Sequence, residues 1–155
     1  GVDQDPHFRI TRDIAPKINK PKPALIHNIM IPPLGGPKGK MSGSNQNETI
    51  YTTDSPEDVK KKINKYAFSG GQPDIEEHRK KGGNPDIDVS YQYLRIFFEP
   101  DDKKLKQIHD DYKSGKMLTG ELKEVLIQKI NNFLKSHQEK RESAKSQIDK
   151  FLYKD

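Results

Sequence analysis

One short apolar run limits the folds that are open to this chain. Ala24–His27 and Ile29–Ile31 are mostly apolar, and Pro21 and Pro23 precede them. An apolar run of this length beside prolines favours a buried strand over a helix. A buried strand needs neighbours, and the only other strand-like stretch is the short Thr49–Thr53. The run therefore predicts the remnant of an α/β domain whose other strands are missing.

The composition agrees with a small core. Hydrophobic residues make up 30% of the 155 residues and charged residues 33%, which is close to the lower limit for a folded protein. No run of roughly 18 apolar residues is present, so we expect no membrane span. The first residues have neither the basic nor the apolar region of a signal peptide, and we expect none. The absence of cysteine excludes disulfides, iron–sulfur clusters and thiolate zinc sites.

From Ser55 onward the sequence has the pattern of successive helices. Capping residues and prolines predict helix starts at five places: Ser55-Pro56, either Pro73 or Asp74, Asp88, Pro100-Asp101 and Thr119. Glycines end the first, second and fourth of these helices. Residues 89–98 are apolar nearly all round, which predicts a helix in the middle of a bundle. An earlier helix is expected to start at Asp5-Pro6, with Asp5 as the N-cap and Pro6 as the first helical residue, and to end or kink at Pro16.

A polar loop, Gly39-Lys40-Met41-Ser42-Gly43-Ser44, follows the proline- and glycine-rich residues 32–37. Backbone amides, two hydroxyls and an ammonium group are the donors that bind phosphate groups in proteins. An ordinary solvated loop explains the same residues about as well. The spacing between its glycines and the following Gly-Lys does not match a P-loop, so that reading fails.

The positive charge of the chain is concentrated just before this loop. The net charge is +5, and residues 9–40 hold seven Lys or Arg against one acid. A local basic patch suits a polyanion such as a triphosphate or an RNA backbone, and a solvated basic surface is the alternative. The five histidines are too scattered to form a metal site, and we place Glu76-Glu77-His78 on a solvated helix face.

Seven short motifs then occur in one order along the chain. They are Gly1-Val2-Asp3-Gln4, Phe8-Arg9-Ile10-Thr11-Arg12-Asp13, Pro21-Lys22-Pro23-Ala24, Lys40-Met41-Ser42-Gly43-Ser44, Ala67-Phe68-Ser69-Gly70-Gly71, Ile75-Glu76-Glu77-His78-Arg79 and Leu118-Thr119-Gly120-Glu121-Leu122. In this order they resemble the C-terminal portion of a eukaryotic-type tryptophanyl-tRNA synthetase, a class I aminoacyl-tRNA synthetase. Tyrosyl-tRNA synthetases share the first and fourth motifs, and the stretch from Ala67 to Arg79 resembles the tryptophan enzymes more closely.

The resemblance implies a mostly α-helical fragment in two domains. Residues 1–44 would be the C-terminal remnant of a Rossmann α/β catalytic domain, including the Lys-Met-Ser-x-Ser loop. Residues 45–155 would be an α-helical anticodon-binding domain. The boundary agrees with the change in sequence pattern near residue 44.

The resemblance also implies a function. The family joins tryptophan and ATP, with Mg²⁺, into tryptophanyl-adenylate and transfers the tryptophanyl group to tRNA(Trp). A cytoplasmic location, a homodimer of the full-length enzyme, no membrane partner and no structural metal are implied with it. The His-Ile-Gly-His-type signature of the family is absent from this chain, so we expect the 155 residues alone to be inactive. The alternative is a stand-alone helical RNA-binding module, for which an adenylate-site motif has no use.

Site residues carry over from the resemblance position by position. Catalytic roles fall on Lys40 and Ser42, which lie in the loop that closes over ATP. The ATP or adenylate group would contact Asp3, Gln4, Lys40, Met41, Ser42 and Ser44, and tryptophan would contact Gln4 and Phe8. The tRNA would contact Gln72, Asp74 and Arg79. Gly43 stands where many class I enzymes have a second Lys, and Gln72-Pro73 stands where members often have Arg-Asp, which puts direct anticodon reading there in doubt.

Overall fold

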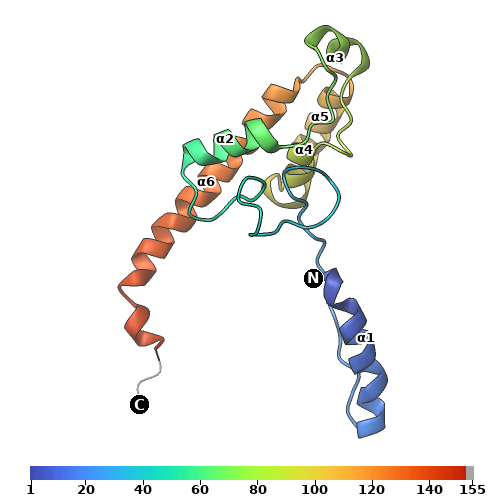
Figure 1. Cartoon of the computed structure of the whole chain (residues 1–155), viewed down its shortest axis with the longest axis vertical. Coiled ribbons are helices and arrows are strands. Elements are labelled where there is room, and N and C mark those ends of the chain that lie inside the picture. The colour runs from blue at the N-terminus through green and yellow to red at the C-terminus, as the bar shows by residue number, and fades with distance from the viewer. Residues whose placement is uncertain (153–155) are drawn as a thin grey trace. The chain divides into compact units, whose positions relative to one another are not determined.

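The computed structural model describes residues 1–152 as helices joined by turns and extended coil. Two units are distinguished, Gly1–Ile31 and Pro32–Asp155, and each is described by itself (Figure 1). The predicted helical content is confirmed. None of the described helices combines the length and the apolar character that crossing a membrane would need.

The first unit is a helix with an extended return segment. A short 3₁₀ turn, η1 (Val2–Gln4), leads into α1 (Asp5–Ile14), and a second turn, η2 (Ala15–Ile18), follows. A helix starts at Asp5-Pro6 as predicted, because proline fits the first helical turn, where its missing N–H is not needed. The predicted N-cap role of Asp5 is wrong, because Gln4 is the N-cap residue. Pro16 lies in η2, just after α1 has ended.

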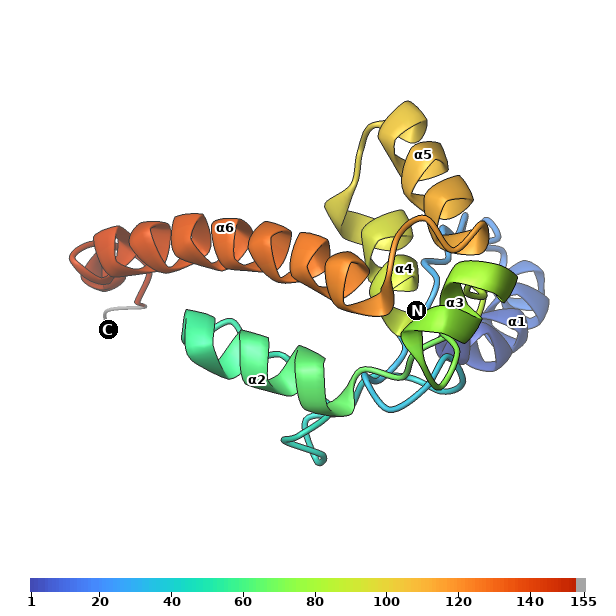
Figure 2. The same cartoon turned by 90° about the horizontal axis from the view of Figure 1, so that it is seen from above.

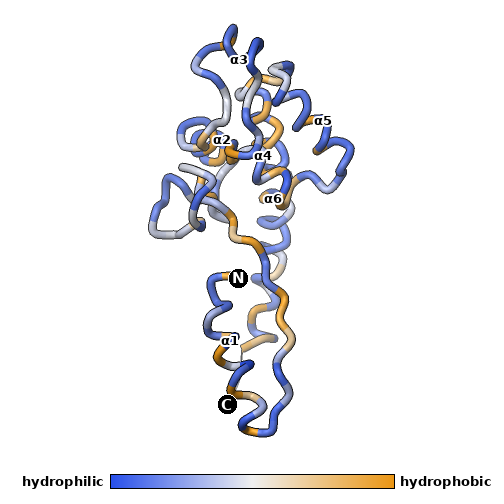
Figure 3. The backbone as a smooth tube through the Cα atoms, turned by 90° about the vertical axis from the view of Figure 1, so that its right-hand side faces the viewer, coloured by the Kyte–Doolittle hydropathy of each residue, from blue (hydrophilic) through white to orange (hydrophobic). Residues whose placement is uncertain are grey.

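The predicted strand at Ala24–His27 is wrong, and with it the prediction of a Rossmann α/β remnant. No strand occurs among residues 1–152. The segment instead runs back along α1 as coil, where the Arg12 guanidinium donates to the Pro23 carbonyl and His27 Nε2 lies 3.0 Å from Asp5 Oδ1. Ile26 is 92% exposed. A strand is held by ladder hydrogen bonds to a neighbour, and the described chain offers this segment none. Figure 3 shows apolar residues along this stretch of the backbone.

The second unit contains the helical bundle. Its elements are α2 (Pro56–Tyr66), α3 (Ile75–Lys81), α4 (Val89–Tyr93), the π-helical turn η3 (Leu94–Phe98), α5 (Asp102–Lys113), α6 (Thr119–Lys145) and the short turn η4 (Ile148–Lys150). The long helix α6 lies beside α2 and also contacts α4 and α5 (Figure 2). The fully buried side chains of the core between them include Val59, Ile63, Leu94, Leu122, Leu126 and Ile130. Burying such side chains contributes roughly 1.5–3 kcal/mol each.

Most of the predicted helix starts are confirmed by side-chain caps. Ser55 Oγ accepts the Asp58 N–H at 3.1 Å, and the Asp58 carboxylate accepts the Ser55 N–H in return. Asp74, Asp88 and Asp101 each accept N–H groups of the first turn that follows them. The predicted cap at Thr119 is wrong, because Leu118 is the N-cap residue and its N–H donates to Glu121 Oε2 at 2.7 Å.

The proline- and glycine-rich segment before the loop is fixed to this bundle. Leu34 is fully buried, and its N–H donates to the Glu48 carbonyl at 3.1 Å while its carbonyl accepts the Phe68 N–H at 2.8 Å. The Tyr93 hydroxyl donates to the Pro32 carbonyl at 2.7 Å. These contacts anchor both ends of the segment that carries the Lys-Met-Ser loop.

Candidate functional site

The Lys-Met-Ser loop is a turn whose polar groups lie at the surface of the second unit. Ser42 and Ser44 are exposed, and their hydroxyl oxygens are 3.3 Å apart. The Ser42 carbonyl accepts the Asn45 N–H at 3.2 Å, which closes the turn. Lys40 and Met41 precede the turn in extended coil, so the one loop places Lys40, Met41, Ser42 and Ser44 in sequence along a short stretch of surface.

The other predicted contacts to adenylate and tryptophan lie in the first unit. Asp3 and Gln4 are in η1, where the Gln4 N–H donates to the Gly1 carbonyl at 3.1 Å. Phe8 lies on α1 and is 40% exposed. The three residues fall within six positions of one another, and the Lys-Met-Ser loop belongs to the other unit. Their predicted roles stay predictions.

The three predicted tRNA contacts lie on the turn before α3 and on α3 itself. The side chain of each also makes a hydrogen bond with a backbone group. Gln72 Nε2 donates to the Gly82 carbonyl at 3.0 Å. Asp74 Oδ1 accepts the Glu77 N–H at 2.8 Å as the N-cap of α3. The Arg79 guanidinium donates to the Gly115 carbonyl at 2.9 Å and also to the Lys116 carbonyl. The structure therefore brings these residues together around one turn, whose hollow of about 450 Å³ is lined by Gln72, Asp74, His78 and the first turn of α6.

His78 is a residue whose placement the sequence analysis missed. It was assigned to a solvated face, yet it is only 3% exposed. Its Nδ1 accepts the Gln72 N–H at 3.4 Å and its Nε2 donates to the Met117 carbonyl at 3.0 Å. These partners fit the ring tautomer that carries hydrogen on Nε2. The residue is a link between the turn and the start of α6, and no sequence signal separates it from a surface histidine.

A buried polar network underlies the same turn and was also missed. Asp88 is fully buried, and its Oδ2 accepts the Gly70 N–H at 2.9 Å and the Tyr112 hydroxyl at 2.7 Å. The Thr119 and Ser69 hydroxyls lie 3.1 and 3.4 Å from the Tyr112 hydroxyl. Burial, with a smaller contribution from the Asp88 carboxylate, raises the pKa of Tyr112 to about 12. The sequence identified Asp88 only as a helix cap.

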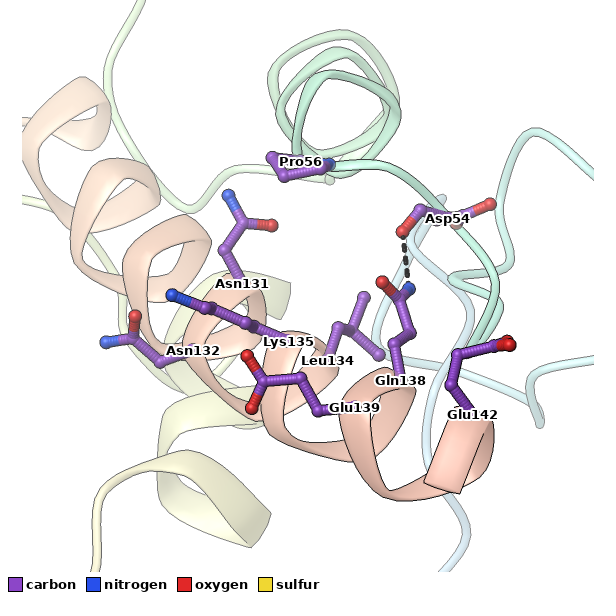
Figure 4. A pocket seen from close by; sticks show the side chains of 9 residues that line it. All are labelled: Asp54, Pro56, Asn131, Asn132, Leu134, Lys135, Gln138, Glu139 and Glu142. Carbon is purple, nitrogen blue, oxygen red and sulfur yellow. Dashed lines mark hydrogen bonds between the residues drawn. The ribbon is translucent and has the colours of Figure 1, made fainter. Parts of the chain in front are cut away.

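A larger pocket lies between the start of α2 and the second half of α6. It has a volume of about 640 Å³, and its lining includes Asp54, Pro56, Asn131, Lys135 and Gln138 (Figure 4). Its charged side chains have both signs, so it does not by itself indicate a ligand. Within residues 1–152, no three His, Asp or Glu side chains gather closely enough to hold a metal ion.

Known proteins of one family resemble this chain over almost its whole length. A tryptophan–tRNA ligase of Sulfurisphaera tokodaii is 59% identical over 153 residues, which are 99% of this chain and 40% of the relative. The cytoplasmic tryptophan–tRNA ligase of Homo sapiens is 52% identical over 150 residues, 97% of this chain and 32% of the relative. The chain thus spans about two fifths or less of the length of these curated relatives.

Solved structures give the same result. The product-bound crystal structure of a parasite tRNA synthetase matches with a TM-score of 0.88 and 52% identity, covering 92% of this chain and 38% of that one. Tryptophanyl-tRNA synthetase from Giardia lamblia matches with a TM-score of 0.85 and 46% identity, covering 92% and 35%. The model of the family described as "tRNA synthetases class I (W and Y)" matches residues 1–135. The chain therefore belongs to the class I tRNA synthetases of the tryptophan and tyrosine group.

Proposed function

We propose that this chain is the C-terminal part of a tryptophan–tRNA ligase. The observation that carries the proposal is the 59% identity to a named tryptophan–tRNA ligase across 153 residues, together with an intact Lys40-Met41-Ser42-Gly43-Ser44 motif. In the proposed reaction the carboxylate of tryptophan attacks the α-phosphorus of ATP and pyrophosphate leaves. A terminal ribose hydroxyl of tRNA(Trp) then attacks the carbonyl carbon of the adenylate and AMP leaves.

This chain would contribute charge and hydrogen-bond donors to the first step. The Lys40 ammonium would stabilise the charge that develops on pyrophosphate, and Ser42, Ser44 and the loop amides would bind phosphate oxygens. The nucleophile is the substrate's own carboxylate, so the protein supplies positioning and electrostatics. Mg²⁺ would enter together with the ATP substrate.

The first unit would belong to the catalytic part. In α1 no residue is buried, and Phe8, Ile10 and Ile14 are each at least 40% exposed. Apolar side chains exposed along one short unit fit a segment that packs against the remainder of a larger domain. We keep residues 1–44 as the proposed catalytic part, with Gln4 and Phe8 at tryptophan and Asp3 near the adenylate.

The helical residues 45–155 would bind the anticodon arm of tRNA(Trp), with Gln72, Asp74 and Arg79 on the contact surface. Arg79, Lys80 and Lys81 are exposed in the last turn of α3, and their positive charge suits an RNA backbone. A cytoplasmic location is proposed because the human relative carries that word in its name. The resemblance alone supports a homodimer of the whole enzyme.

A domain exchange tests the proposal. Residues 1–155 would replace the matching segment of the Sulfurisphaera tokodaii ligase, which is 40% of that protein. We expect tryptophan-dependent ATP–pyrophosphate exchange, and we expect Lys40→Ala to reduce it on the order of 10²–10³-fold, as for loss of one transition-state donor. Lys38→Ala is the control, because Lys38 lies just outside the motif. A folded chimera with no exchange above background would contradict the proposal, and it would favour the RNA-binding module if the 155-residue chain still bound tRNA.

A further inference from the structure

Two carbonyl groups of the Lys-Met-Ser loop are held by side chains that follow it. Thr49 Oγ1 donates to the Ser42 carbonyl at 2.7 Å. The Tyr51 hydroxyl donates to the Gly43 carbonyl at 2.9 Å. Thr49 is only 6% exposed, so its bond is largely shielded from water. Two consecutive peptide groups of the loop are therefore oriented by the hydroxyls of Thr49 and Tyr51, which lie outside the Lys-Met-Ser-x-Ser motif.

The direction of these carbonyls fixes the direction of two N–H groups. The peptide bonds concerned are trans, and in a trans peptide plane the carbonyl and the N–H point in opposite directions. Since the Ser42 and Gly43 carbonyls face Thr49 and Tyr51, the N–H groups of Gly43 and Ser44 face the other way. The Ser44 N–H has only a long contact, 3.4 Å to Ser42 Oγ. Successive backbone N–H groups in a turn can together form a concave donor site for anions.

Lys62 of α2 fixes both of these hydroxyl-bearing residues. Its Nζ donates to the Thr49 carbonyl at 2.9 Å and lies 4.7 Å from the centroid of the Tyr51 ring. The same ammonium pairs with Asp54 Oδ2 at 2.7 Å, and both side chains are mostly buried, at 16% and 11% exposed. The Tyr51 N–H donates to that carboxylate oxygen as well, at 2.9 Å.

The segment is also tied to α6. Gln138 Nε2 donates to the carbonyls of Thr52 at 3.0 Å and Asp54 at 3.1 Å, and the second of these bonds is drawn in Figure 4. Contacts from α2 and from α6 therefore meet on residues 49–54, which in turn hold the loop. A hydrogen-bonded chain of this kind positions a flexible loop without touching the ligand itself.

We propose that Thr49 and Tyr51 are positioning residues that hold the loop with the Gly43 and Ser44 N–H groups directed at phosphate oxygens. The ligand class is a polyphosphate, and its assignment as the β- and γ-phosphates of ATP rests on the proposed function. Lys62 and Asp54 support the two positioning residues from the bundle. The hydrogen bonds from Thr49 and Tyr51 restrict the motion of the loop before any phosphate binds.

The test uses the 155-residue chain, ¹⁵N-labelled, with inorganic pyrophosphate as the probe. Heteronuclear NOE values of the Gly43 and Ser44 amides are measured first without ligand, and their chemical shifts are then followed during titration at constant ionic strength. Tyr51→Phe and Thr49→Val each remove one hydroxyl. We expect both to lower the two NOE values and to raise the pyrophosphate dissociation constant about fivefold, as one lost hydrogen bond implies. The pair together is expected to have a larger effect than either alone.

Matched controls remove a tyrosine or threonine hydroxyl at other positions. Tyr66→Phe and Thr53→Val delete hydroxyls that make no hydrogen bond to the loop in the described part of the chain. Both are expected to leave the NOE values and the dissociation constant unchanged. Unchanged NOE values in Tyr51→Phe and Thr49→Val would overturn the positioning role. Absence of any pyrophosphate shift at Gly43 and Ser44 in the wild-type chain would overturn the phosphate assignment. Failure of the proposed function is seen separately, as an inactive chimera with normal NOE values here.

Discussion

The Tyr112 hydroxyl donates a 2.7 Å hydrogen bond to Oδ2 of the fully buried Asp88 carboxylate. The same oxygen accepts the Gly70 N–H at 2.9 Å, while Oδ1 accepts the Ser90 N–H at 2.9 Å. One carboxylate therefore joins α5, the start of α4 and the turn that carries the predicted tRNA contacts. A buried carboxylate is tolerated only when its oxygens are this fully hydrogen-bonded.

Tyr112→Phe should destabilise the second unit. Hydrogen bonds to charged groups contribute about 1.5–3 kcal/mol, so we expect a loss of that size in the free energy of unfolding. Urea denaturation followed by circular dichroism measures it. Tyr91→Phe is the control, because Tyr91 is also buried but its hydroxyl makes no hydrogen bond in the described structure. Equal stability of the two variants would show that the bond to Asp88 contributes nothing.

Stability should fall with alkaline pH, partly through Tyr112. Burial, followed by the Asp88 carboxylate, raises the pKa of this phenol from 10.0 to about 12. Between these values the unfolded state loses the proton while the folded state keeps it, so the stability that is present below pH 10.0 is lost as pH rises to about 12. Burial also raises the pKa of Tyr93. We expect Tyr112→Phe to show a shallower decrease over this range, and identical slopes would contradict the assignment.

Gly70→Ala should disrupt the turn that precedes α3. A Cβ at Gly70 would lie 2.0 Å from the Asn84 carbonyl oxygen, and that carbonyl belongs to the backbone and cannot move aside alone. We expect destabilisation of about 1–3 kcal/mol, measured by thermal unfolding. Gly120→Ala is the matched control, because a Cβ there meets nothing within 4 Å. Since Gly120 is helical, its replacement should stabilise by about 0.5–1 kcal/mol.

Local signals in the sequence predicted much of the helical fold. Ser55, Asp74, Asp88 and Asp101 cap helices because a cap depends on the few residues that follow it. The order of the seven motifs predicted the family from the sequence alone, because matching motifs requires no knowledge of how side chains pack. Thr119, which is not an N-cap residue, directs its hydroxyl to Tyr112, seven positions away, and to Ser69, 50 positions away in the sequence.

What the sequence could not predict depends on distant partners. Ala24–His27 has the composition of a strand, but strand formation requires a neighbour, and the described chain supplies none. The burial of His78 likewise depends on Met117, which lies 39 residues away. The Lys-Met-Ser motif is a local pattern of residues, whereas the hydrogen bonds from Thr49 and Tyr51 that orient it depend on how the chain folds back on the loop.

Arg79 offers a test of the predicted tRNA surface that separates RNA contact from a structural role. Its guanidinium donates to the Gly115 and Lys116 carbonyls, so loss of the side chain also removes a contact between α3 and the turn after α5. We expect Arg79→Ala to lower affinity for tRNA(Trp) and to reduce the magnitude of the log–log salt slope by about 0.7–0.9, as loss of one phosphate contact implies. Filter binding at several salt concentrations measures the slope, and Lys103→Ala on α5 controls for general loss of charge. A weakened affinity with an unchanged slope would assign Arg79 to the backbone contacts alone, because a structural defect removes no phosphate contact.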